Sequence, residues 1–429
     1  MSRRSWFVAA VLVAALVARL AYVLLAPLPP ISGDAAGYDA AAQRLVATGT
    51  YAYPVVAYAA TGRITGDAYA EFARMRPNAY TMPGYTLFLA AIWRVVPDAE
   101  ARLTAARVAQ ALLGALSLLL LYLLVRRVLD EKAAAIALVA AAIYPPFVWA
   151  TGELLTETLY AFVLLAFLLA VVAALESARL RDFALAGALL GVSTLIRPLA
   201  VVWVALVVLY MMVSKRFTWG KTALATAVLG LALVAVMSPW WARNAVRYGS
   251  FIPLTTCGAN PLAASTSPSY LAGGRPEVDY PPDLLDDDLA LGRYWRNVAD
   301  AQIAYIVKHD PWAYVRIKLL NARFAVIHFW PEEPAGALNT ALARRYSRLM
   351  LYLFYALGLF GIWAQRRNGK LLLIASLPLY FIAAHLLTLF LNRYLYPAMW
   401  VWVVPAAAGV AAVWEFAAKR FAGRRPVSA

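Results

Sequence analysis

The sequence predicts an all-α membrane protein that crosses the bilayer about ten times. Of its 429 residues, 63% are hydrophobic and only 14% are charged, whereas soluble domains are about 45–50% apolar and about 25% charged. Apolar runs recur along the chain, and a helix that crosses a bilayer needs roughly 20 apolar residues. Short basic links stand at every second gap between these runs, which is typical of a chain that crosses a membrane repeatedly.

The first apolar run extends from Trp6 to Ala26 and follows Arg3 and Arg4. It is longer than the roughly 7–15 apolar residues of a signal-peptide core, and no cleavage site of small residues stands out. We therefore expect a retained membrane helix within residues 1–27.

Further apolar runs predict helices 2–7 within residues 104–241 and helices 8–10 within residues 349–418. The stretch from Phe183 to Tyr210 is interpreted as two helices that break at Arg197 and Pro198, because proline ends or kinks a helix. The nine runs lie at 108–125, 133–149, 154–175, 183–196, 199–213, 222–241, 349–364, 371–391 and 395–418.

The basic links predict the orientation of the chain. Together with Arg3, Arg4 and the basic tail at 419–429, they define one side, which the positive-inside rule assigns to the cytoplasm. Much of the net charge of +16 therefore reflects topology, and it gives no reason to expect nucleic-acid binding. The links contain Arg126, Arg127 and Lys132; Arg179 and Arg181; Lys215, Arg216 and Lys221; and Arg366, Arg367 and Lys370.

Two long segments, 28–103 and 242–348, then face outward and are expected to carry interfacial helices. Residues 85–96 are apolar but brief, and counting them as a span would reverse the sidedness of everything that follows. We therefore expect them to lie along the outer interface or to dip into it. The chemistry of the protein should face outward as well.

Metal and redox chemistry have few candidate ligands in this chain. Cys257 is the single cysteine, so no disulfide can form within the chain. The three histidines, His309, His328 and His385, are far apart in the sequence, which argues against a histidine-rich metal site. Any metal ion would need carboxylates.

Asp34 lies just beyond the first apolar run, at the start of a stretch whose apolar residues recur at helical spacing. One interpretation is that its carboxylate caps the N-terminus of this interfacial helix. The other is that it acts as a general base, which requires only that it reach an acceptor hydroxyl at roughly 2.6–3.2 Å. The residues alone leave both open.

Glu153 and Glu157 stand at the outer start of the fourth run. Their spacing of four places them on one helix face, about one turn apart. Carboxylates favour a helix N-terminus, which accounts for Glu153. Glu157 lies a turn deeper, where a carboxylate is costly unless it faces a polar cavity. Glu157 is therefore a candidate for function.

Arginines also gather at the predicted outer rim, against the positive-inside bias. They are Arg197, Arg243 next to Asn244, Arg247 and Arg393. Each one alone is explained by snorkelling towards the interface. Because the guanidinium group presents a planar fork of donors, an outer cluster of them suits a phosphate-bearing lipid head group.

Seven motifs occur in a characteristic order over most of the first 260 residues. They are Asp34 with Tyr38; Arg76-Pro77; Met82-Pro83-Gly84-Tyr85 and the apolar residues after it; Tyr144-Pro145-Pro146; Glu153-Leu154-Leu155-Thr156-Glu157; Leu195-Ile196-Arg197-Pro198; and Pro239-Trp240-Trp241-Ala242-Arg243-Asn244. In order, spacing and sidedness they resemble the GT-C membrane glycosyltransferases of the protein O-mannosyltransferase and aminoarabinose transferase superfamily, often called glycosyltransferase family 39.

The resemblance implies a GT-C-like helix bundle that transfers a sugar from a polyprenyl-phosphate donor at the outer face of the plasma membrane. It implies Asp34 as the catalytic base, with Glu157 and Glu153 as the second acidic position. Tyr38, Arg76 and Tyr85 are expected to bind substrate, together with the outer arginines and Asn244. The chain departs from the family at Ala35 and Ala36, where a second acidic residue often stands beside the first aspartate.

The expected reaction is an inverting displacement in which an acceptor hydroxyl attacks the anomeric carbon and lipid phosphate leaves. Phosphate leaves as an anion, so the reaction needs a base and cationic stabilisation, and no cofactor is required. A divalent ion held by Asp34 and Glu157 is an optional addition. The expected partners are the donor, membrane lipid and an acceptor whose class the sequence does not identify.

A second hypothesis is a flippase or transporter for lipid-linked sugars. Such proteins often contain internal repeats and broken helices near the bilayer midplane. No repeat is visible in this chain, and the charged candidates collect on one predicted side. The sequence therefore favours the enzyme.

Overall fold

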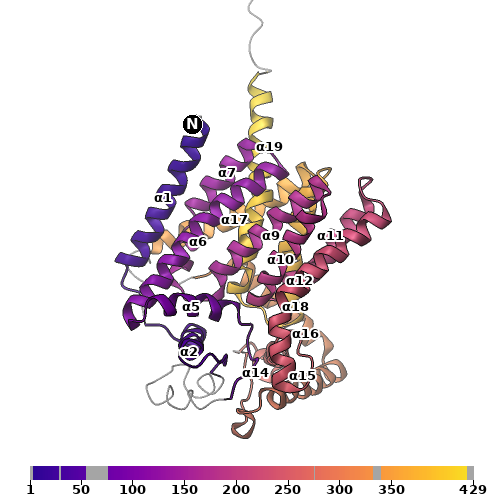
Figure 1. Ribbon diagram of the computed structural model, residues 1–429. Helices are drawn as coiled ribbons and strands as arrows, with labels where there is room; N and C mark the ends of the chain where they lie inside the picture. Colours follow the sequence, from indigo (N-terminus) through magenta and orange to yellow (C-terminus); the bar gives the residue numbers. More distant parts are fainter. Residues whose placement is uncertain (1–2, 29, 55–75, 275, 332–339, 423–429) are drawn as a thin grey trace, which may run out of the picture.

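The computed structural model describes residues 3–28, 30–54, 76–274, 276–331 and 340–422. Within these ranges the structure is helical and contains no strand. Figure 1 shows a helix bundle, with the start of α1 and the end of α19 at one end of it. The two chain ends therefore lie on the same side of the bundle, as the charge pattern predicts.

Each predicted apolar run forms a helix of this bundle. The helices are α1 (Arg3–Leu25), α6 (Ala99–Val128), α7 (Glu131–Ala142), α9 (Thr156–Ser177), α10 (Leu180–Ile196), α11 (Ala200–Val213), α12 (Trp219–Tyr248), α17 (Ala341–Ala364), α18 (Gly369–Leu387) and α19 (Tyr396–Ala422). The expected break at Arg197 and Pro198 is confirmed, because α10 ends at Ile196 and α11 begins at Ala200.

Within the described residues, seven helices are long and apolar enough to cross a membrane. The third predicted run is not straight: α7 is followed by the short helices α8 (Pro145–Trp149) and η1 (Ala150–Gly152), and the chain bends by 68° between them. Counted as one bent span, it brings the number to eight. The helices α10 and α11 have 17 and 14 residues, which is short for a full span. The count of about ten therefore stays a prediction.

The described parts of the two long segments between the spans fold at the end of the bundle opposite the start of α1 and the end of α19 (Figure 1). The shorter helix α5 lies across that end, as expected for an apolar stretch too brief to span. The elements of these segments are α2 (Gly33–Thr48), α5 (Gly84–Val95), α13 (Asn260–Thr266), α14 (Pro268–Leu271), η2 (Pro282–Leu284), α15 (Asp288–His309) and α16 (Pro311–Ile327); η3 (Asn392–Leu395) precedes α19.

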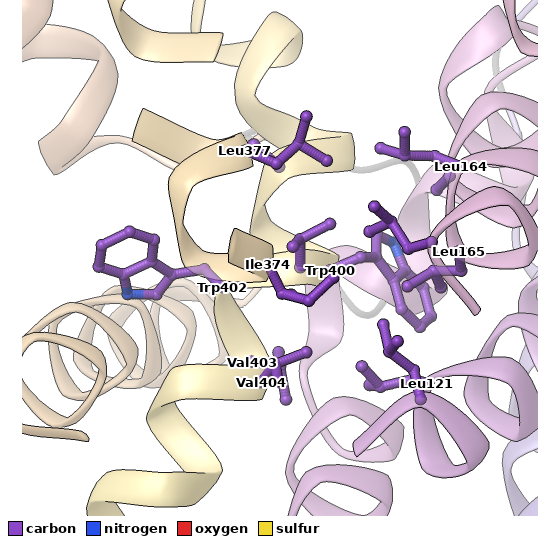
Figure 2. Close-up of a cluster of buried hydrophobic side chains, with 14 of the residues drawn as sticks. Leu121, Leu164, Leu165, Ile374, Leu377, Trp400, Trp402, Val403 and Val404 are labelled. Carbon is purple, nitrogen blue, oxygen red and sulfur yellow. The ribbon is translucent and has the colours of Figure 1, made fainter. Parts of the chain in front are cut away.

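The core of the bundle is apolar and closely packed. Figure 2 shows this core between α6, α9, α18 and α19, where Leu164 and Leu165 face Ile374 and Leu377. Small residues bring backbones together, as is common in membrane bundles. A Cβ atom added to Gly361 of α17 would lie 2.0 Å from the carbonyl oxygen of Pro405 in α19.

Asp288 fastens the outer segments to the bundle. Its Oδ2 atom accepts hydrogen bonds from the Ala79 backbone N–H at 3.0 Å, the Tyr248 hydroxyl at 2.7 Å and the Thr256 hydroxyl at 2.8 Å. One carboxylate therefore joins the segment before α5, the end of α12 and the start of α15. The acidic patch seen in the sequence contributes this buried anchor as well as exposed charge.

We predict that the end carrying α2 and α15 faces away from the cytoplasm. In a Cys257→Ser background, a membrane-impermeant thiol reagent applied from outside should label Asp286→Cys, whose site is exposed on the outer segment. It should label Arg367→Cys, exposed on a predicted cytoplasmic link, only after the membrane is opened. The background without an added cysteine is the control. The reverse pattern would overturn the assigned orientation.

Candidate functional site

Asp34 sits in the first turn of α2, but it does not cap this helix. The N-cap position is Ser32, which makes no side-chain capping bond. The Asp34 carboxylate instead forms an ion pair with the Arg393 guanidinium of η3. The alternative in which Asp34 is only a capping residue is therefore wrong.

Asp34 and Arg393 line a polar cavity of about 300 Å³. Its wall also contains Glu153 and Arg107, so that two carboxylates and two guanidinium groups meet in one place. The remaining wall comes from residues 30–33 before and at the start of α2, from Ala35, and from Gly152, Leu154 and Leu155. A cavity of this composition suits a ligand that carries both hydroxyl groups and an anionic group.

Arg107 was not among the residues that the sequence singled out. It stands one residue before a predicted apolar run, where it looks like an ordinary interfacial residue. In the structure its Nε atom donates to the Gly152 carbonyl oxygen at 3.1 Å. The general bias of arginine away from outer loops was the signal that could have identified it.

Glu153 and Glu157 do not share a helix face, contrary to the expectation. Helix α9 begins at Thr156, so Glu153 lies in the irregular segment before it. Gln110 stabilises that segment, since its Nε2 atom donates to the carbonyl oxygens of Thr151 at 3.0 Å and Glu153 at 2.8 Å. As a result Glu153 opens into the Asp34 cavity and Glu157 points elsewhere.

The environment of Glu153 raises the pKa of its carboxyl group. Burial is the main cause; Arg107 opposes the shift and Glu157 adds to it. A carboxyl group with a raised pKa holds its proton more readily than a surface glutamate does. Burial thus favours the neutral form of Glu153 more than it does for a surface glutamate.

Glu157 is almost fully buried, with 1% of its surface exposed. Its Oε1 atom pairs with Arg197 Nη2 at 2.5 Å, and Arg197 Nε donates to the Thr156 hydroxyl at 2.7 Å. The expected polar surroundings of this deeper carboxylate are thus supplied by Arg197, at the break between α10 and α11. The pair stands where a lone carboxylate would be costly.

Tyr38 of α2 and Tyr85 of α5 pack the two helices against each other. The ring of Tyr38 packs edge-on against Tyr85 at 5.0 Å and against Tyr53 at 5.5 Å between centroids. The Tyr85 hydroxyl donates to Gln110 Oε1 at 3.0 Å. Burial, and next the charge of Asp34, raise the pKa of the Tyr38 phenol. The described wall of the cavity includes neither ring, so their expected contact with substrate stays a prediction.

Arg243 lines a second cavity, so the outer arginines do not form one cluster. This cavity of about 480 Å³ lies between the end of α2, α5, α10 and α12, and its walls are largely apolar. Arg243 lines it and donates to the Tyr51 carbonyl oxygen at 2.9 Å and to Asn244 Oδ1 at 2.8 Å.

Asn244 is completely buried beside Arg243. Arg247 donates to the carbonyl oxygen of Pro77, which lines the second cavity, at 2.9 Å, and the neighbouring Arg76 is exposed. The predicted residues therefore divide into a group of acids and arginines around Asp34 and a group around Arg243. Helix α2 separates them, because its start lines one cavity and its end lines the other.

The carboxylates that could bind a metal ion form ion pairs with arginines. Across the described part of the chain, no group of three or more histidine, cysteine, aspartate or glutamate side chains is placed to hold a metal ion. Asp34 and Glu157, the two ligands that the sequence suggested, are each paired with a guanidinium group. The optional divalent ion stays a prediction.

Comparisons with known proteins match this architecture. A family model described as dolichyl-phosphate-mannose-protein mannosyltransferase matches residues 81–242. The archaeal oligosaccharyltransferase AglB from Archaeoglobus fulgidus, solved with an inhibitory peptide and a dolichol-phosphate, superposes with a TM-score of 0.57 and 16% identity. The match covers 100% of this chain and 53% of that one.

The chain has the GT-C fold. The same oligosaccharyltransferase tethered to an acceptor peptide gives a TM-score of 0.57 at 15% identity, covering 96% of this chain and 50% of that one. ArnT from Cupriavidus metallidurans bound to undecaprenyl phosphate gives 0.45 at 16% identity, covering 96% and 78%. A search of curated proteins for sequence relatives finds no match.

The GT-C fold confirms the predicted architecture of a multi-pass membrane protein that resembles the GT-C glycosyltransferases. The chain spans about half the length of AglB. Fold alone does not fix substrate or mechanism, which depend on the site.

We predict that Arg197 stabilises the fold by neutralising Glu157. Arg197→Met should leave a buried, unpaired carboxylate and cost about 3–5 kcal/mol of folding free energy. The double variant Arg197→Met with Glu157→Leu should recover much of this loss. Thermal unfolding of purified protein measures both. Arg181→Met, which removes an exposed partner of Asp182, is the control and should change little. A single Arg197 variant as stable as the wild type would contradict the assignment.

Proposed function

We propose that the protein transfers a sugar from a polyprenyl-phosphate donor to an acceptor hydroxyl, with inversion, at the outer face of the plasma membrane. The observation that carries the proposal is the cavity in which Asp34 meets Arg393, Arg107 and Glu153. The start of α2, which lines this cavity, lies at the end of the bundle opposite the start of α1 and the end of α19 (Figure 1). There a water-soluble acceptor and a membrane-embedded donor can meet.

In the proposed reaction, Asp34 accepts the proton of the acceptor hydroxyl while the hydroxyl oxygen attacks the anomeric carbon. A bond forms between that carbon and the acceptor oxygen, and the bond from the carbon to the phosphate oxygen breaks. The bonding electron pair leaves with polyprenyl phosphate. The leaving group is a stable anion, so a base and nearby cations suffice.

Arg393 is the arginine best placed to receive the donor phosphate. It lines the cavity of Asp34, and its Nε atom is buried without a hydrogen-bond partner in the described structure. A phosphate oxygen would satisfy that donor, and a bidentate contact with the guanidinium group would replace its bond to Asp34. Donor binding would then release Asp34 to act as a base.

Arg243, another of the predicted outer arginines, is proposed to contact a different part of the donor. Its cavity is walled by Leu45, Leu87, Leu195 and Trp240 among others, which suits a prenyl chain. Because the phosphate must lie next to the carbon that Asp34 activates, the Asp34 cavity is the more economical position for it. Arg243, together with Asn244 and Arg247, would then help to position the prenyl chain of the donor.

Glu153 is proposed as the second acid of the cavity, where it positions a substrate hydroxyl. Its position in the wall of the cavity carries this role, and its raised pKa favours the neutral form more than at an exposed glutamate. Glu157 is proposed to act indirectly, by holding Arg197. The reaction as proposed needs no divalent ion, because guanidinium groups supply the positive charge.

A lipid-linked sugar flippase remains the alternative function. The fold is shared with AglB, an oligosaccharyltransferase, and the two acids and two arginines line one cavity. A transport path would need polar groups that continue through the bundle, whereas the core between α6, α9, α18 and α19 is apolar (Figure 2). Both observations support transfer.

We predict that Asp34→Asn reduces sugar transfer at least about a hundredfold while the protein still binds polyprenyl phosphate. The amide keeps the size of the side chain but cannot take the hydroxyl proton. Transfer by purified protein from a polyprenyl-phosphate sugar donor is the measurement. Asp286→Asn, an exposed change on the same side, is the matched control. Turnover near the wild-type rate in Asp34→Asn would rule out the base.

A graded series at Arg393 tests the position of the phosphate. Arg393→Lys keeps the charge but loses the planar fork, and Arg393→Ala loses both. Activity should fall in the order Arg, Lys, Ala, with the alanine variant losing roughly tenfold or more, because a charge-assisted hydrogen bond contributes about 1.5–3 kcal/mol.

The same series at Arg243 distinguishes the two cavities. If the phosphate sits beside Asp34, substitutions of Arg393 should weaken the binding of short-chain and long-chain polyprenyl phosphates alike. Substitutions of Arg243 should mainly weaken the long-chain donor. If Arg393→Ala is as active as the wild type and Arg243→Ala is inactive, the phosphate site must instead be assigned to the second cavity.

A further inference from the structure

One aromatic ring lies between the two arginines of the site. The guanidinium carbon of Arg197 is 5.4 Å from the centroid of the Tyr394 ring, and that of Arg393 is 5.3 Å from the same centroid. Tyr394 belongs to η3 and follows Arg393 directly. The ring therefore contacts both arginines that hold a candidate acid.

This contact joins the two ion pairs of the site. Arg393 holds Asp34 of α2, and Arg197 holds Glu157 of α9. Apart from this ring, the two ion pairs lie on different elements of the chain. The ring links the two pairs into one chain of contacts. Asp34 contacts Arg393, both arginines contact the Tyr394 ring, and Arg197 contacts Glu157.

The Tyr394 ring is itself held from another element. His385, in the last turn of α18, stacks on it at 4.9 Å between centroids and with 27° between ring planes. A tyrosine fixed in this way can hold a guanidinium group in a defined position. Both arginines can thus be ordered before any ligand binds.

An aromatic ring differs from a carboxylate as a partner for arginine. It attracts the guanidinium group through its quadrupole and adds no negative charge. An arginine held by a ring keeps its full positive charge and its donors for an anion. An arginine held by a second carboxylate would be neutralised.

We propose that Tyr394, backed by His385, is the positioning residue that holds Arg393 and Arg197 in place for an anionic phosphate. The inference rests on the proposed function and deepens it. When the donor phosphate takes Arg393 from Asp34, the ring keeps the guanidinium group at the cavity. Arg197 keeps its ion pair with Glu157 and also remains in contact with the Tyr394 ring.

The test compares Tyr394→Phe with Tyr394→Leu. Phenylalanine keeps the ring and should bind polyprenyl phosphate within about twofold of the wild type. Leucine removes the ring and should weaken binding about tenfold or more. Tyr314→Leu is the matched control, because the Tyr314 ring also holds a cation, Lys318 at 4.8 Å, but lies on α16 outside the cavity wall. It should bind like the wild type.

A double-mutant cycle separates positioning from packing. If Tyr394 acts through Arg393, Tyr394→Leu should weaken phosphate binding much less in an Arg393→Lys background than in the wild type. Equal effects in the two backgrounds would overturn the proposal. So would equal binding by the Phe and Leu variants, or equal loss in both, which would assign the effect to packing or to the hydroxyl group.

The binding assay keeps this proposal distinct from the proposed function. A wild type that binds polyprenyl phosphate but transfers no sugar would overturn the transferase, while the Phe and Leu comparison would still decide the role of the ring. An active transferase with the wrong Phe and Leu result would overturn the ring alone. A wild type that binds no polyprenyl phosphate would overturn both.

Discussion

A charge buried among apolar membrane helices is tolerated only when another group neutralises it. In this protein the constraint is met by arginine. Glu157 with Arg197 fixes α9 against the break between α10 and α11, and Asp34 with Arg393 fixes the start of α2 against η3. The position of the cavity follows, since its wall contains the second of these pairs and the segment just before α9. The ion pairs that hold this end of the bundle together are also the groups that a sugar phosphate would meet.

Irregular backbone near the membrane imposes a second requirement, because its polar groups have no helical partners. The chain of η1 and the residue after it meets this requirement with side chains from α6: Gln110 donates to the carbonyl oxygens of Thr151 and Glu153, and Arg107 to that of Gly152. This support allows the chain to depart from helix and to turn Glu153 into the cavity. The residues that satisfy the hydrogen bonds of this backbone therefore also set the geometry of the site.

Much of the fold could be predicted from the sequence, because long apolar runs and basic links are local signals. The break at Arg197 and Pro198 was predictable for the same reason, since proline acts on its own helix. Asp34 was identifiable from its place after the first span. Its pairing with Arg393 was not predictable, because Arg393 lies 359 positions away and only packing of η3 against α2 brings the two together.

Two other features lay beyond a sequence reading. Helical spacing suggested that Glu153 and Glu157 share a face, but the start of α9 at Thr156 depends on contacts with Gln110 from another helix. The outer arginines were expected to cluster because they share a predicted side of the membrane. Residues on one side of the membrane can still lie far apart, and here α2 separates two cavities on that side.

The most direct test of the account is an experimental structure of the full chain with a bound polyprenyl phosphate. The account predicts the phosphate within hydrogen-bond distance of Arg393, in the cavity that contains Asp34, with Asp34 released from Arg393. It further predicts that the Arg393 and Arg197 guanidinium groups still contact the Tyr394 ring. A phosphate bound away from the Asp34 cavity, with the ion pair between Asp34 and Arg393 intact, would contradict the central claim.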